Sequence, residues 1–408
     1  MLIAAATTQR AIGWVIFGLV IAGFVIYILV NIRSGKPEVG SEVELAANRK
    51  PYLDDAELET KKLDRSLLFA LGMLGIIAVG LPLYWLGEPG RHDGAAAGFD
   101  YRATQRGAAS YESRCAQCHG PGGTGGVVSV ALTDADGKFE AQVSWKAPAL
   151  TSVLTRYDES EVTQVLNYGR NGVMPAWGAP GGGPLTTKQI DDLIHYLRSI
   201  QLPEDQVATA VADGVKAGAR EILLTPTSSL QKGLNDANAL TDPTQKANAL
   251  KAANAAIDKA VDDYVKSISD PNSPWFATVY GKLLFNNAAG QGAYGCARCH
   301  TKGWSYDGAT VTSKTTGSKL VDAYIDGGGF FGPNLRGGVT VRKFETVKQH
   351  QDFIALGTSD GKLYGVAGMG SGQMPGFGAR TDDTLKKTYP AILTENEIAA
   401  IVAYERSL

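Results

Sequence analysis

Hydrophobic residues are concentrated in two runs near the N-terminus of this 408-residue chain. Residues 11–30 contain no charged side chain, and residues 66–87 form a second uncharged run. Twenty helical residues span roughly 30 Å, which is the thickness of the hydrocarbon core of a bilayer. We therefore predict two transmembrane helices, at 11–30 and 66–87, and we expect Pro82 to kink or end the last turn of the second, because proline kinks or terminates a helix. The first run is longer than the roughly 7–15 apolar residues of a signal peptide, so we expect it to be retained.

The Lys and Arg residues around these runs are unevenly distributed. The segment between the runs contains Arg33, Lys36, Arg49, Lys50, Lys61, Lys62 and Arg65. The tail that precedes the first run contains only Arg10. Because loops rich in Lys and Arg stay on the cytoplasmic side of a membrane, we predict that residues 1–90 are a membrane anchor with a cytoplasmic loop at 32–65. The chain after residue 88 then lies on the outer face, with residues 88–106 as a short tether.

Beyond the anchor, apolar residues follow the spacing of amphipathic helices. The segment 202–274 contains two such series: Val207, Val211 and Val215, and then Leu250, Ile257, Val261, Tyr264 and Ile268. Asp242 followed by Pro243 is typical of a helix start, because proline is well accommodated in the first turn of a helix. We predict an all-α fold with two or three helices in this segment. A flexible Ala-rich linker is the alternative.

The four cysteines are the most informative residues of the chain. Cys115 and Cys118 precede His119, and the second set is Cys296, Cys299 and His300, so that each set reads Cys-x-x-Cys-His. This pattern is typical of covalent haem c attachment, in which two thiols add to the two vinyl groups of the porphyrin and the histidine binds the iron. A redox-active dithiol and a four-cysteine zinc site are the alternatives. The formal net charge of −2 gives no reason to expect a nucleic-acid partner.

An internal repeat surrounds the two motifs. Each motif follows a Gly-x-x-x-aromatic sequence and precedes a Met-Pro-x-aromatic-Gly stretch, after which an amphipathic helix is expected. The paired positions are Gly107 and Gly281, Tyr111 and Phe285, Met174 and Met374, and Tyr196 and Tyr404. The apolar faces of the two trailing helices are Ile190, Leu193, Ile194 and Leu197, and then Ile398, Ile401 and Val402. The repeat therefore predicts two similar domains.

With these motifs the sequence resembles the class I cytochrome c family twice, over residues 103–201 and 275–408. The resemblance implies two small helical domains, each with a leading helix that crosses a trailing helix beside one haem. It also implies that Met174 and Met374 are the sixth iron ligands, opposite His119 and His300. The carbonyl groups of Pro148 and Pro333 would accept hydrogen bonds from those histidines.

The choice of methionine also has a physical basis, because a thioether is a soft, neutral ligand that favours reduced iron and raises the reduction potential. Met369 and His350 are rival ligands in the second domain. His195 could be proposed for the first haem, but the repeat aligns it with Ala403, so we expect an ordinary helix residue. His92 follows the membrane run and is expected to face solvent.

The resemblance also implies a function. Two tethered haem domains are similar to the dihaem cytochrome c subunit of actinobacterial cytochrome bc complexes, although here both predicted spans lie at the N-terminus. We expect an electron-transfer subunit on the outer face of a bacterial plasma membrane, with two haem c groups and no catalysis by this chain alone. Its partners would be other subunits of a cytochrome bc complex or a terminal oxidase, together with a small electron-carrier protein.

Three alternatives to this function remain open. The first is the dihaem subunit of a cbb-type oxidase, whose expected features we do not find in the 32–65 loop. The second is a dihaem peroxidase-like enzyme, and the third is a haem-based gas sensor. The last two need an open or displaceable sixth position on the iron, which Met174 and Met374 disfavour.

Overall fold

The computed structural model describes residues 15, 18–30, 33, 61–133, 136, 138–170, 174–287, 295–306, 311–312, 319–321, 325–330, 332–358, 374–382 and 386–408. The chain divides into two compact units, Met1–Arg102 and Ala103–Leu408. Each unit is described by itself. Both Cys-x-x-Cys-His motifs lie in the second unit.

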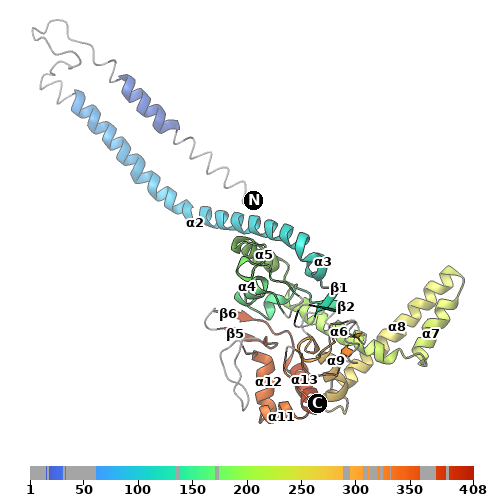
Figure 1. Ribbon diagram of the computed structural model, residues 1–408. Coiled ribbons are helices and arrows are strands. Elements are labelled where there is room, and N and C mark those ends of the chain that lie inside the picture. The colour runs from blue at the N-terminus through green and yellow to red at the C-terminus, as the bar shows by residue number, and fades with distance from the viewer. Residues whose placement is uncertain are drawn as a thin grey trace, which may run out of the picture. The chain divides into compact units, whose positions relative to one another are not determined.

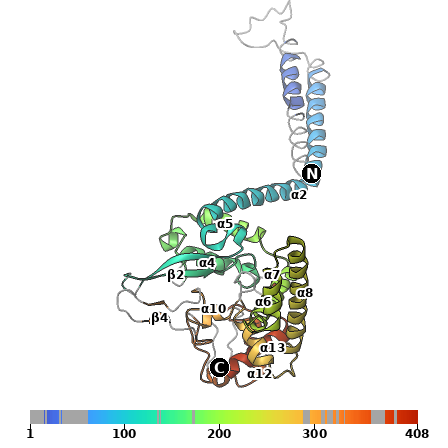
Figure 2. The ribbon, with the colours of Figure 1, turned by 90° about the vertical axis from the view of Figure 1, so that its right-hand side faces the viewer.

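The first unit contains two apolar helices that lie side by side in both views (Figure 1 and Figure 2). Among the described residues, one helix, Lys61–Arg114, is long and apolar enough to cross a membrane, and the described part of the other, Gly18–Val30, is shorter. Tyr27 stacks on Phe69 with ring centroids 4.8 Å apart, so the two helices are in contact. Their apolar side chains are largely exposed, as expected of a surface that contacts lipid. Residues 34–60 of the predicted cytoplasmic loop lie outside the described residues.

The second apolar helix continues beyond residue 87, where we expected it to end, and Pro82 does not terminate it. The helix α2 runs from Asp64 to Arg114 and includes both Pro82 and Pro89. Long membrane helices tolerate proline because local adjustments satisfy the freed backbone groups again. Residues 88–106, which we predicted to be a tether, belong to the same helix, and His92 is exposed on it as expected.

The second unit begins with residues 103–201, which we predicted to be a domain and call the first haem-motif domain. The end of α2 supplies its leading helix, and α5 supplies its trailing helix. Thr186 caps α5 through a capping box with Gln189, which explains why the helix begins at that point. The other elements are α3 (Ala116–His119), η2 (Pro121–Gly123), β1 (Gly126–Thr133), β2 (Phe139–Ala147), η3 (Val153–Thr155), α4 (Glu159–Tyr168), η4 (Ala179–Gly181) and α5 (Thr187–Ser199).

Residues 275–408, which we predicted to be a second domain and call the second haem-motif domain, contain elements in a similar order. A π-helical turn followed by α9 leads, and α13 trails, capped by Thr394 and Glu397 as α5 is capped by Thr186 and Gln189. The elements are η5 (Phe276–Gly281), α9 (Lys282–Phe285), α10 (Ala297–His300), β3 (Val311–Thr312), β4 (Lys319–Val321), α11 (Val339–Lys343), α12 (Val347–Leu356), β5 (Arg380–Asp382), β6 (Lys387–Tyr389) and α13 (Glu395–Ser407).

Three helices occupy the segment between the domains: α6 (Glu204–Leu223), α7 (Ser229–Ala239) and α8 (Pro243–Ile268). The Asp242 side chain accepts a hydrogen bond from the Gln245 amide, so α8 starts at Pro243 as the sequence predicts. The valine face of α6 joins the core of the second domain, where Asn287 also donates to the Val211 carbonyl at 3.0 Å. The segment is therefore helical, and α6 packs on the second domain.

The fold is mostly helical, but the all-α prediction is wrong in detail, because three antiparallel strand pairs are present among the described residues. The longest joins β1 to β2, with Gly126 opposite Ala147 and Val130 opposite Val143. Ala141, Val143, Trp145 and Ala147 alternate with more exposed residues along β2. This period of two, with β-branched and aromatic residues, is the pattern of a half-buried strand.

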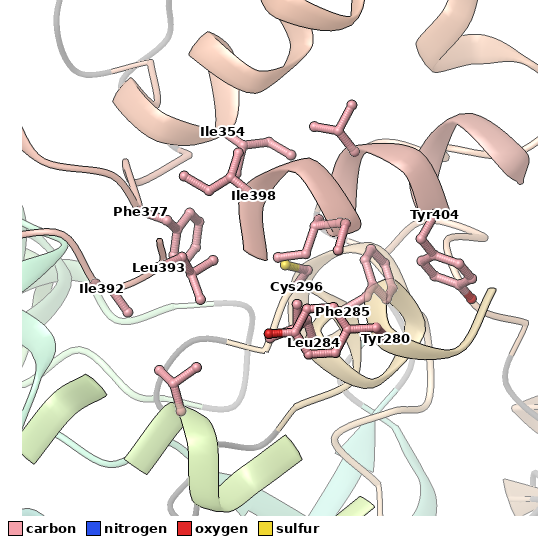
Figure 3. Packing of buried hydrophobic residues seen from close by; sticks show 14 of the residues in the cluster. Tyr280, Leu284, Phe285, Cys296, Ile354, Phe377, Ile392, Leu393, Ile398 and Tyr404 are labelled. Atoms are coloured by element: carbon pink, nitrogen blue, oxygen red, sulfur yellow. The ribbon is translucent and has the colours of Figure 1, made fainter. Parts of the chain in front are cut away.

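Each domain has its own apolar core next to its cysteine motif. The first core gathers Tyr111, Leu166 and Leu193, with Cys115 packed against it. The second core is larger and includes Cys296 itself, which is 6 % exposed. Figure 3 shows Cys296 beside Phe285 and Ile398, between the leading segment and α13. The two crossing elements of each domain therefore bring the first thiol of each motif, Cys115 or Cys296, to the core.

Candidate haem-binding sites

The first motif forms the short helix α3, with Cys115 at its N-cap position. His119 Nδ1 lies 2.8 Å from the carbonyl oxygen of Pro148. A carbonyl only accepts, so Nδ1 carries the proton and the lone pair of Nε2 is available for a metal. Burial lowers the pKa of His119, against the opposing effect of the Pro148 hydrogen bond, and this favours the neutral imidazole that a metal requires.

The second motif forms α10 with the same arrangement. His300 is buried, and its Nδ1 donates to the carbonyl oxygen of Pro333 at 2.9 Å. The backbone of Gly332 lies flat against the imidazole, since a Cβ at that position would be 2.8 Å from both Cε1 and Nδ1 of His300. The ring is thus held between its proline carbonyl and a glycine that admits no side chain. Both histidine–proline pairs expected from the resemblance are present.

All four cysteines have free thiols in the structure. Burial raises the pKa of Cys115 to about 11 and raises the pKa of Cys296 well above its ordinary value. Burial likewise raises the pKa values of Cys118 and Cys299. Within the described part of the chain, no group of three or more His, Cys, Asp or Glu residues is arranged to hold a metal ion by itself.

Met174 and Met374 occupy equivalent places. Met174 packs against the core that contains Cys115, and Met374 packs against the core that contains Cys296. Both methionine carbonyls face a glycine with a positive φ angle, Gly169 and Gly357. A Cβ on those glycines would be 2.4 Å and 2.5 Å from the respective carbonyl oxygens. The structure thus brings each methionine into the core of its own motif.

The rival ligands have other surroundings. His350 is buried, bonds to Glu405 through Nε2 at 2.9 Å and stacks on Phe344 with ring centroids 4.5 Å apart. The imidazole of His350 is therefore engaged in a hydrogen bond and a ring stack inside the protein core. His195 lies on α5 with its Nε2 3.9 Å from Asp191, as an ordinary helix residue would. Met369 lies outside the described residues.

These residues fit two haem c groups. Each site offers two unpaired thiols, an imidazole with its Nε2 lone pair available, and a methionine packed against the same core. A haem has two apolar faces that need such a core, and in cytochromes c its iron is held by one histidine and one methionine. The ligand roles of His119, Met174, His300 and Met374 are taken up as proposals below.

The sequence did not predict the contact between the two haem-motif domains. The Lys146 amide donates to the Ser305 carbonyl at 2.8 Å, and Trp145 packs edge-on against Tyr306 with ring centroids 5.0 Å apart. At another point Arg380 donates to the carbonyl of Arg156 at 2.7 Å. The buried face of β2 packs on Tyr306, but the sequence of β2 did not indicate this partner.

Comparisons with known proteins bear on the first of these sites. The family described as cytochrome c oxidase, cbb3-type, subunit III matches residues 102–197. The chain is 36% identical over 106 residues to the cbb3-type cytochrome c oxidase subunit FixP of Azorhizobium caulinodans, covering 26% of this chain and 30% of that protein. It is 27% identical over 179 residues to the subunit CcoP of Rhodobacter capsulatus, covering 42% of this chain and 48% of that protein.

The chain thus aligns with less than half the length of these two relatives. No solved structure matches. The family match covers α3, β1, β2, α4 and most of α5, together with His119 and Met174. Residues 102–197 are therefore a c-type cytochrome domain of the kind found in cbb3-type oxidases, and the chain is a haem c protein whose two Cys-x-x-Cys-His motifs fit two haems.

Proposed function

We propose that the chain is the electron-transfer dihaem cytochrome c subunit of a cbb3-type terminal oxidase. The observation that carries this proposal is the match of residues 102–197 to subunit III of such oxidases. The repeated site around His300 supports a second haem in the same chain. The chain would be anchored in a bacterial plasma membrane, with both haem domains on the outer face.

The chain's residues define what each site does. A bound haem c supplies a one-electron couple between ferric and ferrous iron. His119 and His300 would hold the iron of a bound haem as neutral imidazoles, because Pro148 and Pro333 fix one tautomer of each ring. Met174 and Met374 would supply the second iron ligand of each site and so would keep water and substrates off the iron. The chemistry is therefore electron transfer, and no bond is made or broken by this chain.

The oxidase is favoured over the cytochrome bc complex that we placed first from the sequence. Both relatives are named as cbb3-type oxidase subunits, and neither is named as part of a cytochrome bc complex. We did not find the features expected of an oxidase subunit in the sequence of the 32–65 loop. Most of this loop lies outside the described part of the chain. A peroxidase-like function would need an iron position that the methionines fill.

Partners follow from the same proposal. The apolar helix Lys61–Arg114 is long enough to hold the chain in the membrane, beside the other subunits of the oxidase. A tethered domain meets its partner at a high effective concentration, which suits a relay better than a free shuttle. Electrons would enter from a cytochrome bc complex or a small electron-carrier protein and leave towards the oxidase.

The test is isolation of the full-length chain from its own membranes in mild detergent. We expect the catalytic subunits of a terminal oxidase to accompany it, and we expect the complex to reduce oxygen with an electron-carrier protein as donor. Replacing Cys115 and Cys118 with Ala should stop that flux while the complex remains assembled. Recovery of cytochrome bc subunits without any oxidase would return the assignment to the bc complex.

A further inference from the structure

Arg298 lies between the two cysteines of the second motif, and its side chain reaches into the first domain. Its Nη1 donates to the carbonyl oxygen of Lys146 at 2.5 Å. Lys146 is on β2, two residues before Pro148, whose carbonyl accepts the hydrogen bond from His119. A residue of one haem-attachment turn is therefore bonded to the strand that positions the iron-binding histidine of the other.

The surroundings of Arg298 fix this contact. Its guanidinium lies over the ring of Trp304, 5.1 Å from the ring centroid, and the Lys146 ammonium lies over the same ring at 5.8 Å. The amide of Lys146 also donates to the carbonyl of Ser305 at 2.8 Å. Lys146 therefore accepts one hydrogen bond from the second domain and donates another to it. The contact is a specific, hydrogen-bonded junction between the two domains.

The charge of Arg298 acts on both sites. An arginine guanidinium stays protonated in proteins, so Arg298 carries a fixed positive charge. It lies between the two cysteines of the second motif, and it is bonded to Lys146, two residues before the carbonyl that His119 contacts in the first. A fixed positive charge in a poorly solvated place disfavours ferric iron, which carries one more positive charge than ferrous iron. The potentials of both haems should therefore depend on this one residue.

We propose that Arg298 is a positioning residue for electron transfer between the two haems, linking the two sites by a hydrogen bond and acting on both with its charge. The inference rests on the proposed function, because it assumes that both sites hold haem. In the step concerned, the ferrous iron of one site is oxidised and the ferric iron of the other is reduced, and no atoms are exchanged. The hydrogen-bonded route runs from the Cys299 turn through the Lys146 carbonyl to Pro148 and His119.

The experiment compares R298Q and R298K in the full-length chain with both haems attached, verified by two haems per chain. Redox titration gives the two potentials, and laser photoreduction followed in time gives the rate between the haems. We expect R298Q to lower both potentials and slow the transfer. We expect R298K, which keeps the charge but loses the planar fork, to keep the potentials near those of the native chain while slowing the transfer.

R342Q is the matched control, because Arg342 also donates from Nη1 to a carbonyl, that of Gly337 in its own domain. R342Q should change neither the potential of the first haem nor the rate of electron transfer between the haems. The inference would be overturned if R298Q kept the native potentials and the native transfer rate, or if only the potential of the second haem changed. If R298Q does not acquire both haems, R298K decides, and an unchanged rate refutes the link. Absence of an oxidase from the purified complex would refute the proposed function and leave these measurements valid.

Discussion

Gly107 lies directly against the main-chain carbonyl of Asp192, so that a Cβ on the glycine would be only 1.9 Å from that oxygen. The same contact recurs in the second domain, where a Cβ on Gly281 would be 2.1 Å from the carbonyl oxygen of Ala400. Four residues after each glycine, an aromatic ring meets a tyrosine of the trailing helix. The ring centroids are 5.0 Å apart for Tyr111 and Tyr196, and 5.4 Å apart for Phe285 and Tyr404.

We expect Gly107→Ala to lower the free energy of unfolding, because the added methyl group must push the two helices apart. Overpacking of this kind costs about 1–3 kcal/mol. Denaturant unfolding of the haem-loaded protein, followed by absorbance of the haem, measures the change.

Gly233→Ala is the matched control. Gly233 is inside α7, and no atom lies within 4 Å of the place that its Cβ would occupy. Because alanine has the higher helix propensity, the substitution should stabilise by up to about 1 kcal/mol. Equal effects of the two substitutions would show that the Gly107 contact does not limit the approach of the helices.

The helix crossing was predictable from sequence because its determinants are local and occur twice. Gly107 with Tyr111 and Gly281 with Phe285 keep one spacing, and capping boxes at Thr186 and Thr394 begin both trailing helices. The histidine–proline pairs followed from the family resemblance. The β1–β2 hairpin was missed because two of the five buried positions on β2 are alanines, which add little to an apolar pattern, and a third is Glu140.

The contact between the domains could not be read from the sequence. Arg298 is a charged residue in a motif whose intervening positions are not needed for haem attachment, and Lys146 takes part through its backbone. The residue types at these two positions do not indicate a hydrogen bond between residues that are 152 positions apart. His350 and Glu405, which form a buried pair, are likewise far apart in the chain and show no shared motif.

Asp192 should make the stability of the first domain sensitive to acid. The Arg106 guanidinium donates to both carboxylate oxygens of Asp192, at 2.8 Å and 2.9 Å, and holds the pKa of that carboxyl below its usual value. A lowered carboxyl pKa contributes stability above the unfolded value of about 3.9, and this is lost as the pH falls through the folded value. Asp192→Asn should therefore destabilise at pH 7, and the difference from the native protein should shrink on going to pH 3.

Urea unfolding at the two pH values measures this difference. Asp191→Asn removes the same charge from the neighbouring position, whose side chain is 54% exposed and contacts Lys188. That pair lies on the surface, so its loss should cost less than about 1 kcal/mol. A difference between native and Asp192→Asn protein that is the same at pH 3 and pH 7 would contradict the role of the carboxylate.

Covalent attachment at both motifs predicts a simple stoichiometry. Denatured protein should keep its haem stain on a gel, and the pyridine haemochrome assay should give about two haems per chain. Cys115→Ala with Cys118→Ala should leave one haem, and so should the corresponding pair at Cys296 and Cys299. Zinc without haem in the purified protein would be incompatible with this chemistry.

The predicted topology can be tested by thiol labelling of intact cells. A cysteine introduced at Ser41, in the loop predicted to be cytoplasmic, should resist an impermeant thiol reagent, because the Lys and Arg residues around it favour the inner face. A cysteine at Gly94, an uncrowded position on α2, should react. The reverse labelling pattern would place the haem domains on the wrong side and refute the proposed orientation.

Met174 and Met374 should set the potentials of the two haems. An imidazole is a stronger donor than a thioether and stabilises ferric iron, so Met174→His and Met374→His should each lower the potential of one haem only. Spectroelectrochemical titration measures both potentials. The long-wavelength charge-transfer band of methionine-ligated ferric haem should weaken in each variant. Met369→Ala is the control in the second domain, and loss of the band there, with retention in Met374→Ala, would move the sixth ligand from Met374 to Met369.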